Sequence, residues 1–211
     1  MIAAAVPGAE PRRRLSAEDR RVEIVEAARR TFARRGFHGT GTAEIAAAAG
    51  CSEPTLYKHF ASKQALFVAA LTYAGVCMRR QVAEFMAGRD DDPLAALVEF
   101  QVTKLANEEY AEIIRLRSLA VTLADDPEIR AVLVEMATSQ RTWVARWLRA
   151  GQEAGSVRTD FDTELAGWLA VALSQLASFR HASEGDVGLA DMAPIVQGFA
   201  ALLAPLEGAS A

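Results

Sequence analysis

The helix start signals along this chain constrain its fold more than any other feature. Asp92-Pro93 and Asp126-Pro127 each place a carboxylate before a proline. Proline is tolerated in the first turn of a helix, and the carboxylate can cap that turn and complement the helix dipole. Alanine is abundant and runs of Val, Ile and Thr are scarce, so propensity favours helix nearly everywhere. The sequence therefore predicts an all-α protein.

Further signals divide the chain into nine expected helices. Ser16-Ala17-Glu18-Asp19 has the spacing of a capping box, and Gly36 is a suitable end for the helix that follows, with Phe37 folding back onto it. Gly50 is expected to end a second helix, and Ser52 and Ser62 to cap two more. The expected helices span residues 16–36, 42–49, 52–60, 63–87, 93–106, 109–123, 127–150, 162–182 and 190–206.

Formal charge is distributed unevenly along the chain. Residues 1–63 hold eleven Lys and Arg against seven Asp and Glu, a net charge of +4, whereas the remainder is −8 and the whole chain −4. Such asymmetry indicates a polyanion-binding end joined to an end with another task. We expect a disordered basic arm at 1–15 followed by two domains, at 16–61 and 62–211; the resemblance given below implies DNA binding for the first, and ligand binding and dimerisation for the second. For the arginine block at 12–14, contact with DNA and a solubilising role both remain open.

The two short helices joined at Gly50-Cys51-Ser52 have the expected geometry of a helix-turn-helix. Small Ala46 permits their close approach, and Cys51 and Leu56 can fill the space between them. Many proteins that bind no DNA contain a similar turn, so the geometry alone does not decide the function.

The residues of this region also resemble the amino-terminal domain of the TetR family of bacterial regulators. The similarity covers about fifty residues and includes a specific string, Thr55-Leu56-Tyr57-x-His59-Phe60-x-x-Lys63. It implies a dimeric, cytoplasmic, helix-turn-helix DNA-binding regulator of transcription, most often a repressor that a small-molecule ligand releases from a palindromic operator. Two recognition helices about 34–36 Å apart would read the two halves of such a site.

The resemblance also implies roles for individual residues. Hydroxyl and backbone N–H groups at Thr40 and Thr42 are expected at phosphate. The recognition helix, capped by Ser52, would turn Glu53, Pro54, Thr55 and Lys58 toward base edges, while Tyr57, His59 and Lys63 would contact the DNA backbone. For Tyr57 and Phe60 the alternative is a place in the core.

Three residues depart from the family pattern. Gly41 stands where a Ser or Thr cap is common, so the cap is expected to fall to Thr40. Thr42 replaces a usual apolar residue, and Cys51 replaces a typical Val.

The carboxyl-terminal helices carry apolar surfaces that are too broad for one neighbour. They suggest a four-helix interface between two copies, where the family dimerises, although burial within a monomer remains the alternative. The expected interface residues are Leu165, Trp168, Leu169, Ala172, Leu173, Leu176, Ile195, Val196, Phe199 and Leu202, and Leu203 belongs to the same apolar surface.

A pocket for a small, largely apolar effector is expected among the helices from 63 to 150. Aromatic and flexible apolar side chains would line it, with arginines as polar partners, although each could equally fill core or surface. The candidates are Phe85, Met86, Phe100, Tyr110, Arg115, Arg117, Met136 and Trp143.

Other classes of protein find little support. His38, His59 and His181 are the only histidines, and no Glu-x-x-His or Cys/His cluster suggests a metal, a cofactor or a catalytic site. Cys51 and Cys77 are expected to be reduced thiols, no secretory signal is expected, and no uninterrupted run approaches about 20 apolar residues. A purely structural helical module is the remaining rival, and salt-dependent DNA affinity would separate it from a regulator.

Overall fold

The computed structural model describes residues 16–89, 92–105, 107–184 and 191–205. Within these ranges nine helices and no strand are present, which confirms the all-α prediction. The helices are α1 (Ala17–Gly39), α2 (Thr42–Ala48), α3 (Glu53–His59), α4 (Lys63–Met86), α5 (Pro93–Leu105), α6 (Glu108–Val121), α7 (Pro127–Ala154), α8 (Thr163–Glu184) and α10 (Met192–Leu203). The arm expected at 1–15 lies outside the described residues.

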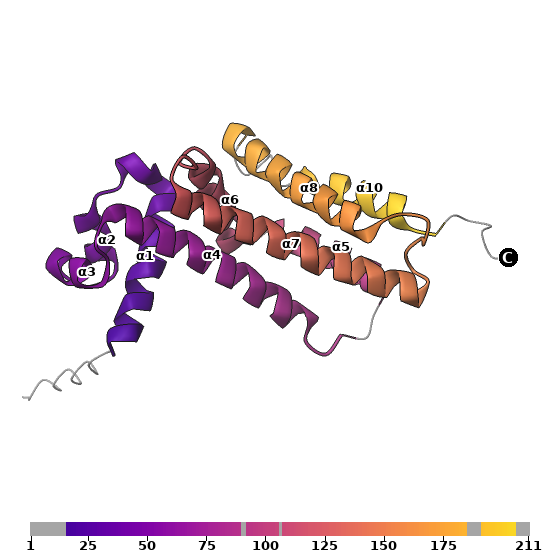
Figure 1. The fold of residues 1–211 in the computed structure, drawn as a ribbon, viewed down its shortest axis with the longest axis horizontal. Coiled ribbons are helices and arrows are strands. Elements are labelled where there is room, and N and C mark those ends of the chain that lie inside the picture. Colours follow the sequence, from indigo (N-terminus) through magenta and orange to yellow (C-terminus); the bar gives the residue numbers. More distant parts are fainter. Residues whose placement is uncertain (1–15, 90–91, 106, 185–190, 206–211) are drawn as a thin grey trace, which may run out of the picture.

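The short helices α2 and α3 lie at one end of the molecule beside α1, and α4 runs from them into a bundle of long helices (Figure 1). In that bundle α7 packs along α8, and α10 packs along α5. Gly167 allows the close approach of α7 and α8, because a Cβ there would lie 2.8 Å from the carbonyl oxygen of Arg141.

Side-chain caps begin the helices at the predicted places. The Ser16 hydroxyl accepts from the Asp19 amide at 3.0 Å, and the Asp19 carboxylate accepts from the Ser16 amide at 3.3 Å, which completes the capping box. Ser62 caps α4 through the Ala65 amide at 3.0 Å, and Asp126 caps α7 through the amide of Ile129 at 3.0 Å. Each bond pairs an amide that the first helical turn leaves without a partner.

The end of the first helix differs from the prediction. Gly36 does break the helical conformation, with φ of 73°, but helical residues resume and continue to Gly39. Phe37 folds back as predicted, and its ring stacks on that of Phe32 with centroids 5.8 Å apart. Because glycine adopts positive φ without a Cβ clash, Gly36 works as a kink here and not as a terminus. The other helix ends fall within four residues of the expected ones.

The main hydrophobic cluster joins the amino-terminal helices to the bundle. It contains Phe32, Leu56 and Leu71 together with Ile113 of α6 and Ile129 of α7, all at most 2% exposed. This cluster crosses the boundary expected at residue 61, so the short helices rest directly on the helices that follow. A second cluster, around Val144, Leu148 and Ala166, fills the far end of the bundle.

Candidate functional site

The turn between α2 and α3 is held by backbone geometry. Gly50 has φ of 64°, and the amide of Cys51 donates to the carbonyl of Ala46 at 2.9 Å. Ala46 is 2% exposed and Leu56 is fully buried, so the two helices pack closely, as the sequence indicated. The Ser52 hydroxyl then accepts from the Thr55 amide at 3.3 Å and caps α3. The predicted helix-turn-helix is therefore present.

One side of α3 faces solvent and carries polar groups. Pro54, Tyr57 and Lys58 are exposed, while Glu53, Thr55 and His59 are half-buried. Tyr57 is 47% exposed, so it does not belong to the core, whereas Phe60 is 4% exposed and does.

A polar cluster ties this side of α3 to α2. The Thr42 hydroxyl donates to the Glu53 carboxylate and lies 3.2 Å from the Tyr57 hydroxyl. These bonds fix the side chains of Glu53 and Tyr57 before any partner arrives, which lowers the entropy that binding would cost.

Thr40 does not play the part that the sequence suggested. Its side chain is 2% exposed, and its hydroxyl donates to the carbonyl of Gly36 at 2.7 Å. Gly41 is the residue before α2, and no side chain caps that helix. The prediction of a Thr40 cap is therefore wrong, because the hydroxyl donates to the carbonyl four residues earlier in the chain.

Lys63 begins α4 beside the turn. Its ammonium lies 4.8 Å from the centre of the Phe37 ring, a cation–π contact that orients the half-buried side chain.

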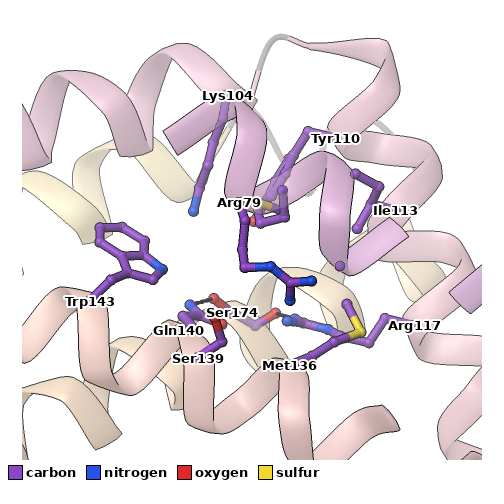
Figure 2. Close-up of a pocket in the computed structure, with 12 residues that line it drawn as sticks. Arg79, Lys104, Tyr110, Ile113, Arg117, Met136, Ser139, Gln140, Trp143 and Ser174 are labelled. Atoms are coloured by element: carbon purple, nitrogen blue, oxygen red, sulfur yellow. Dashed lines mark hydrogen bonds between the residues drawn. The ribbon is translucent and has the colours of Figure 1, made fainter. Parts of the chain in front are cut away.

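A pocket lies among α4, α5, α6, α7 and α8 (Figure 2). Tyr110, Arg117, Met136 and Trp143, all expected there, line it. The space among its side chains amounts to about 520 Å³, counting the mouth open to solvent. The lining residues that the sequence analysis missed are Gly75, Met78, Arg79, Lys104, Ile113, Ser139, Gln140 and Ser174.

Other candidates fall outside the lining. Phe85 packs on Phe100, with centroids 5.2 Å apart, and Phe100 in turn contacts Trp143 of the lining at 5.8 Å. Arg115 reaches Glu108 at 2.8 Å on the opposite side of α6, and Met86 sits at the end of α4. Phe85, Met86, Phe100 and Arg115 therefore do not line this pocket. Arg115 points from another side of α6, whereas Phe85 and Met86 share the face of Met78 and Arg79 but lie about two turns farther along α4.

The polar groups of the pocket are mainly cationic. Burial, reinforced by the nearby Arg117, lowers the pKa of Lys104 to about 7. Burial raises the pKa of Tyr110 and lowers that of Arg117. Arg117 donates through Nη2 to the carbonyl of Ser174 at 2.6 Å and to the Ser178 hydroxyl at 2.9 Å.

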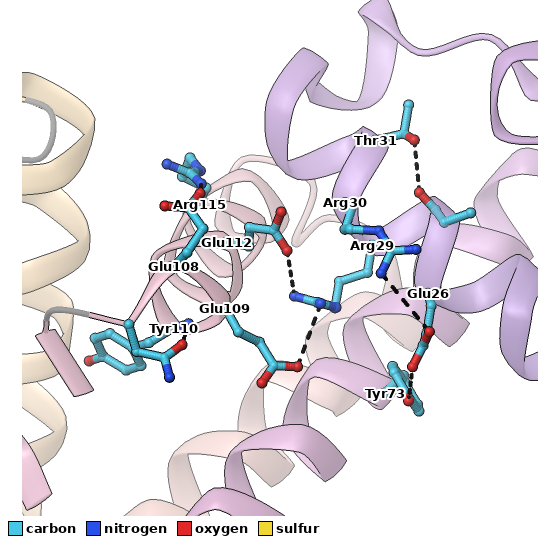
Figure 3. Close-up of polar contacts among 12 residues, drawn as sticks. Glu26, Arg29, Arg30, Thr31, Tyr73, Glu108, Glu109, Tyr110, Glu112 and Arg115 are labelled. Atoms are coloured by element: carbon cyan, nitrogen blue, oxygen red, sulfur yellow. Dashed lines mark hydrogen bonds and ion pairs between the residues drawn. The ribbon is translucent and has the colours of Figure 1, made fainter. Parts of the chain in front are cut away.

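Helix α6 connects this pocket to α1 (Figure 3). Its residues Tyr110, Ile113 and Arg117 line the pocket, while Glu109 and Glu112 face Arg29 of α1. The Arg29 guanidinium lies 2.9 Å from the Glu112 carboxylate and 3.6 Å from that of Glu109, and Arg29 is only 5% exposed. A shift of α6 would thus be transmitted to the helix that supports α2 and α3.

An apolar surface is exposed on α8. Leu165, Trp168, Leu169 and Leu176 are between 38% and 59% exposed, as an interface between copies requires, and Ala172 is exposed with them. Phe179, which the sequence analysis did not name, is 68% exposed on the same helix.

Helix α10 contributes less to this surface than the sequence suggested. Leu202 is 72% exposed, but Leu203 is buried at 6%, and Phe199 and Ile195 pack against the protomer's own core. Leu173 and Val196 border a small internal hollow between α8 and α10. The inward face of α10, with Leu203, therefore packs on α5 and on the second cluster.

The described residues contain neither a metal-binding cluster nor a single membrane-spanning helix. No group of three or more His, Cys, Asp or Glu side chains could hold a metal ion there. No single helix in this part of the chain is long and apolar enough to cross a bilayer. Helices α3 and α4 reach the required length and apolar composition only when taken together, and they are bent by 68° at the break between them.

Comparison with known proteins gives a consistent result. Residues 24–70 match the family described as "Bacterial regulatory proteins, tetR family". The HTH-type transcriptional regulator RutR of Escherichia coli (strain K12) is 34% identical over 137 residues, covering 62% of this chain and 63% of RutR. The match therefore spans less than two thirds of the length of RutR. The regulator UidR of the same strain is 25% identical, covering 75% of this chain and 79% of UidR.

Solved structures share the fold. A transcriptional regulator from Saccharomonospora viridis, determined in complex with choline, superposes with a TM-score of 0.73 and 26% identity over 86% of this chain and 95% of its own. A TetR-family regulator from Cytophaga hutchinsonii superposes with a TM-score of 0.76 at 18% identity, over 92% and 100% of the two chains.

Proposed function

This chain belongs to the TetR family of bacterial transcriptional regulators, and we propose that it is a repressor that a small molecule releases from a palindromic operator. The proposal rests on the connection of two features by one helix, the exposed polar side of α3 and the pocket. The exposed polar side of α3 stands at the start of α4, and α4 continues without a break to Gly75, Met78 and Arg79 in the pocket. The structure supports a single molecule that contacts DNA at one end and a ligand at the other.

In the proposed complex α3 enters the major groove. Glu53, Pro54, Thr55 and Lys58 contact base edges, and Tyr57, His59, Lys63 and the backbone N–H at Thr42 contact phosphate. The exposure of Pro54, Tyr57 and Lys58 supports this division, as does the position of Lys63 at the foot of α4.

The protein acts as a homodimer in this proposal. One seven-residue recognition helix offers too few contacts for specificity, whereas two helices about 34–36 Å apart read both halves of a palindrome. The exposed leucines and Trp168 of α8, with Leu202 of α10, supply the apolar surface that two copies would bury in a four-helix interface.

Ligand binding is proposed to act on DNA affinity through α4 and α6. The related protein from Saccharomonospora viridis binds choline, which supports a ligand site in this fold. Choline itself is not the expected effector here, because its positive charge would meet Arg79, Lys104 and Arg117. A coupling of about 1–3 kcal/mol would lower operator affinity roughly 5- to 150-fold.

The proposal assigns the protein no catalytic role. Its curated relatives are described as transcriptional regulators. Because a bacterial operator lies in the cytoplasm, we place the protein there.

Selection of bound DNA from a random pool tests the proposal. The expected result is a palindromic consensus whose affinity falls steeply with salt, followed by release when a screened small molecule is added. Enrichment of no sequence, together with weak binding that is insensitive to salt, would contradict it and favour the structural-module alternative.

A further inference from the structure

Cationic side chains converge on the pocket from three helices. Arg79 comes from α4, Lys104 from α5 and Arg117 from α6 (Figure 2). None of the lining residues in the described part of the chain is acidic. Arg79 has a carboxylate partner outside the pocket, Glu135 at 3.4 Å, which leaves Lys104 and Arg117 as the cations to be accounted for.

Lys104 is buried without a counterion. Its residue is 8% exposed, and its side chain extends into the pocket with the ammonium toward the centre (Figure 2). The ammonium lies 4.9 Å from the centre of the Tyr110 ring and 5.4 Å from that of Phe100, and no hydrogen bond or ion pair reaches it from the residues the structure describes. A buried ammonium without an anion or acceptor is costly, so a site of this kind needs an explanation.

Arg117 is also incompletely paired. Nη2 is bonded to Ser174 and Ser178, but Nε is buried and has no hydrogen-bond partner. The residue is 8% exposed, and the charges of Lys104 and Arg117 disfavour each other in the absence of an anion. One anion between them would relieve the repulsion and accept hydrogen bonds from both.

The rest of the lining suits an apolar body. Met78, Ile113, Met136 and Trp143 provide flexible aliphatic and aromatic surface. Met136 also approaches Gly75 closely, because a Cβ at Gly75 would lie 3.4 Å from its Cγ. The methionine chains can shift to admit groups of different shape.

We propose that the effector is a small amphipathic carboxylic acid whose carboxylate binds between Lys104 and Arg117 and whose apolar body packs on Trp143 and Met136. This inference rests on the proposed role of the pocket as the effector site and names the chemical class of the effector. Monocarboxylates are favoured because the lining around Lys104 and Arg117 is mostly apolar, and the Gln140 amide in it already donates to Ser174 and to the carbonyl of Ala170.

Matched probes of the same shape and different charge test the class. The probes are phenylbutyrate, phenylbutanamide and phenylbutylamine, and decanoate, decanamide and decylamine. Binding to the protein alone is followed by thermal stabilisation and by tryptophan fluorescence in a Trp147→Phe, Trp168→Phe background that leaves Trp143 as the reporter, so no operator is needed. We expect at least one carboxylate to bind at least about tenfold more tightly than its amide and amine. Failure of both carboxylates to bind, or equal or tighter binding of the amide or amine, overturns the proposal.

Variants locate the carboxylate. Lys104→Met keeps the length and apolar stem of the side chain and should abolish the preference for carboxylate over amide, whereas Lys104→Arg should keep it. Arg146→Met is the matched control, since Arg146 is an exposed cation on α7, the helix that carries Trp143. An undiminished preference in Lys104→Met would place the anion elsewhere and overturn the assignment.

Proton uptake gives a readout that a purely structural lysine would not produce. The groups that face Lys104 are Arg117 and Tyr110 of α6 and Arg79 of α4. Burial holds the pKa of Lys104 at about 7, so at about pH 8 the free side chain is mostly neutral, and a bound carboxylate should make it take up most of one proton. Calorimetry in buffers of different ionisation enthalpy measures this uptake, which should vanish in Lys104→Met. Binding of phenylbutyrate without proton uptake would contradict the role of Lys104.

The test keeps the two proposals separate. Carboxylate binding without any effect on operator DNA would leave the pocket assignment intact and contradict the repressor proposal. Operator release by neutral or cationic compounds alone would support the repressor proposal and contradict the carboxylate assignment.

Discussion

Replacement of Arg29 by methionine should destabilise the protein strongly. The change leaves Glu112, whose side chain is 10% exposed, without its partner at 2.9 Å between α1 and α6. Removal of one member of a buried ion pair costs about 3–5 kcal/mol, whereas replacement of both by apolar residues is often neutral. We expect a loss of about 3 kcal/mol in the free energy of unfolding. Glu109 also loses its contact with Arg29, but this adds little, because the contact is longer, at 3.6 Å, and Glu109 is more exposed.

Urea denaturation of a double-mutant cycle measures this contribution. The single variants are Arg29→Met and Glu112→Leu, and the double variant should recover most of the stability lost in Arg29→Met. Arg30→Met is the control, since the Arg30 guanidinium lies 4.0 Å from Glu26 in an exposed pair one residue along the same helix. A cost below about 1 kcal/mol for Arg29→Met, or strictly additive single effects, would refute the reasoning that this pair is buried and coupled.

Further predictions concern the DNA-binding end and the pocket. Ser52→Ala removes the cap of α3 and should cost about 1 kcal/mol in thermal unfolding, so a change within about 0.2 kcal/mol of zero would contradict the cap. Gly50→Ala should lower the free energy of unfolding by about 1 kcal/mol, because an alanine is strained at φ of 64°, even though no atom lies within 4 Å of the new Cβ. An unchanged free energy of unfolding would show that the turn relaxes. Lys58→Ala should change the sequence preference of the protein, whereas Lys63→Ala should weaken binding to all sequences about equally, and parallel losses for both in a binding-site selection would argue against these roles. Because Lys104 has a pKa of about 7 in the folded state, below its ordinary 10.5, the unfolded chain binds more protons between these values and stability should rise with pH. From about pH 7 to about pH 9 the gain should be about 2 kcal/mol relative to Lys104→Met in urea denaturation, and equal pH dependence of the two proteins would contradict it.

The sequence predicted the elements whose determinants are local. The caps at Ser16, Ser52, Ser62 and Asp126 and the turn at Gly50 follow from the side chain or backbone freedom of one or two residues, and all lie where expected. The helix-turn-helix follows from them, because its two helices are short and joined by a turn of defined geometry. Thr40 shows the limit, since its hydroxyl bonds back to the carbonyl of Gly36 and does not cap the helix that follows.

The pocket depends on where five helices pack against one another, and no local pattern specifies this. Phe85 and Met86 lie on the same face of α4 as Met78 and Arg79, but two turns farther along the helix, beyond the pocket. Spacing by three or four residues does relate Met136, Gln140 and Trp143 on α7, a signal that would have added Gln140 to the candidates. The sequence analysis did not include Lys104, because a single lysine in the last turn of an apolar helix usually points into solvent. Its burial is visible only once α5 packs beside α6 and α7.

The stoichiometry and spacing of protein on a selected operator test the central claim most directly. Analytical ultracentrifugation and hydroxyl-radical footprinting of the complex should show two protomers, with protected half-sites one helical turn apart on the same side of the duplex. A single protomer bound to one unrepeated site, or two protomers whose contacts survive substitution of the exposed residues of α3, would contradict the account.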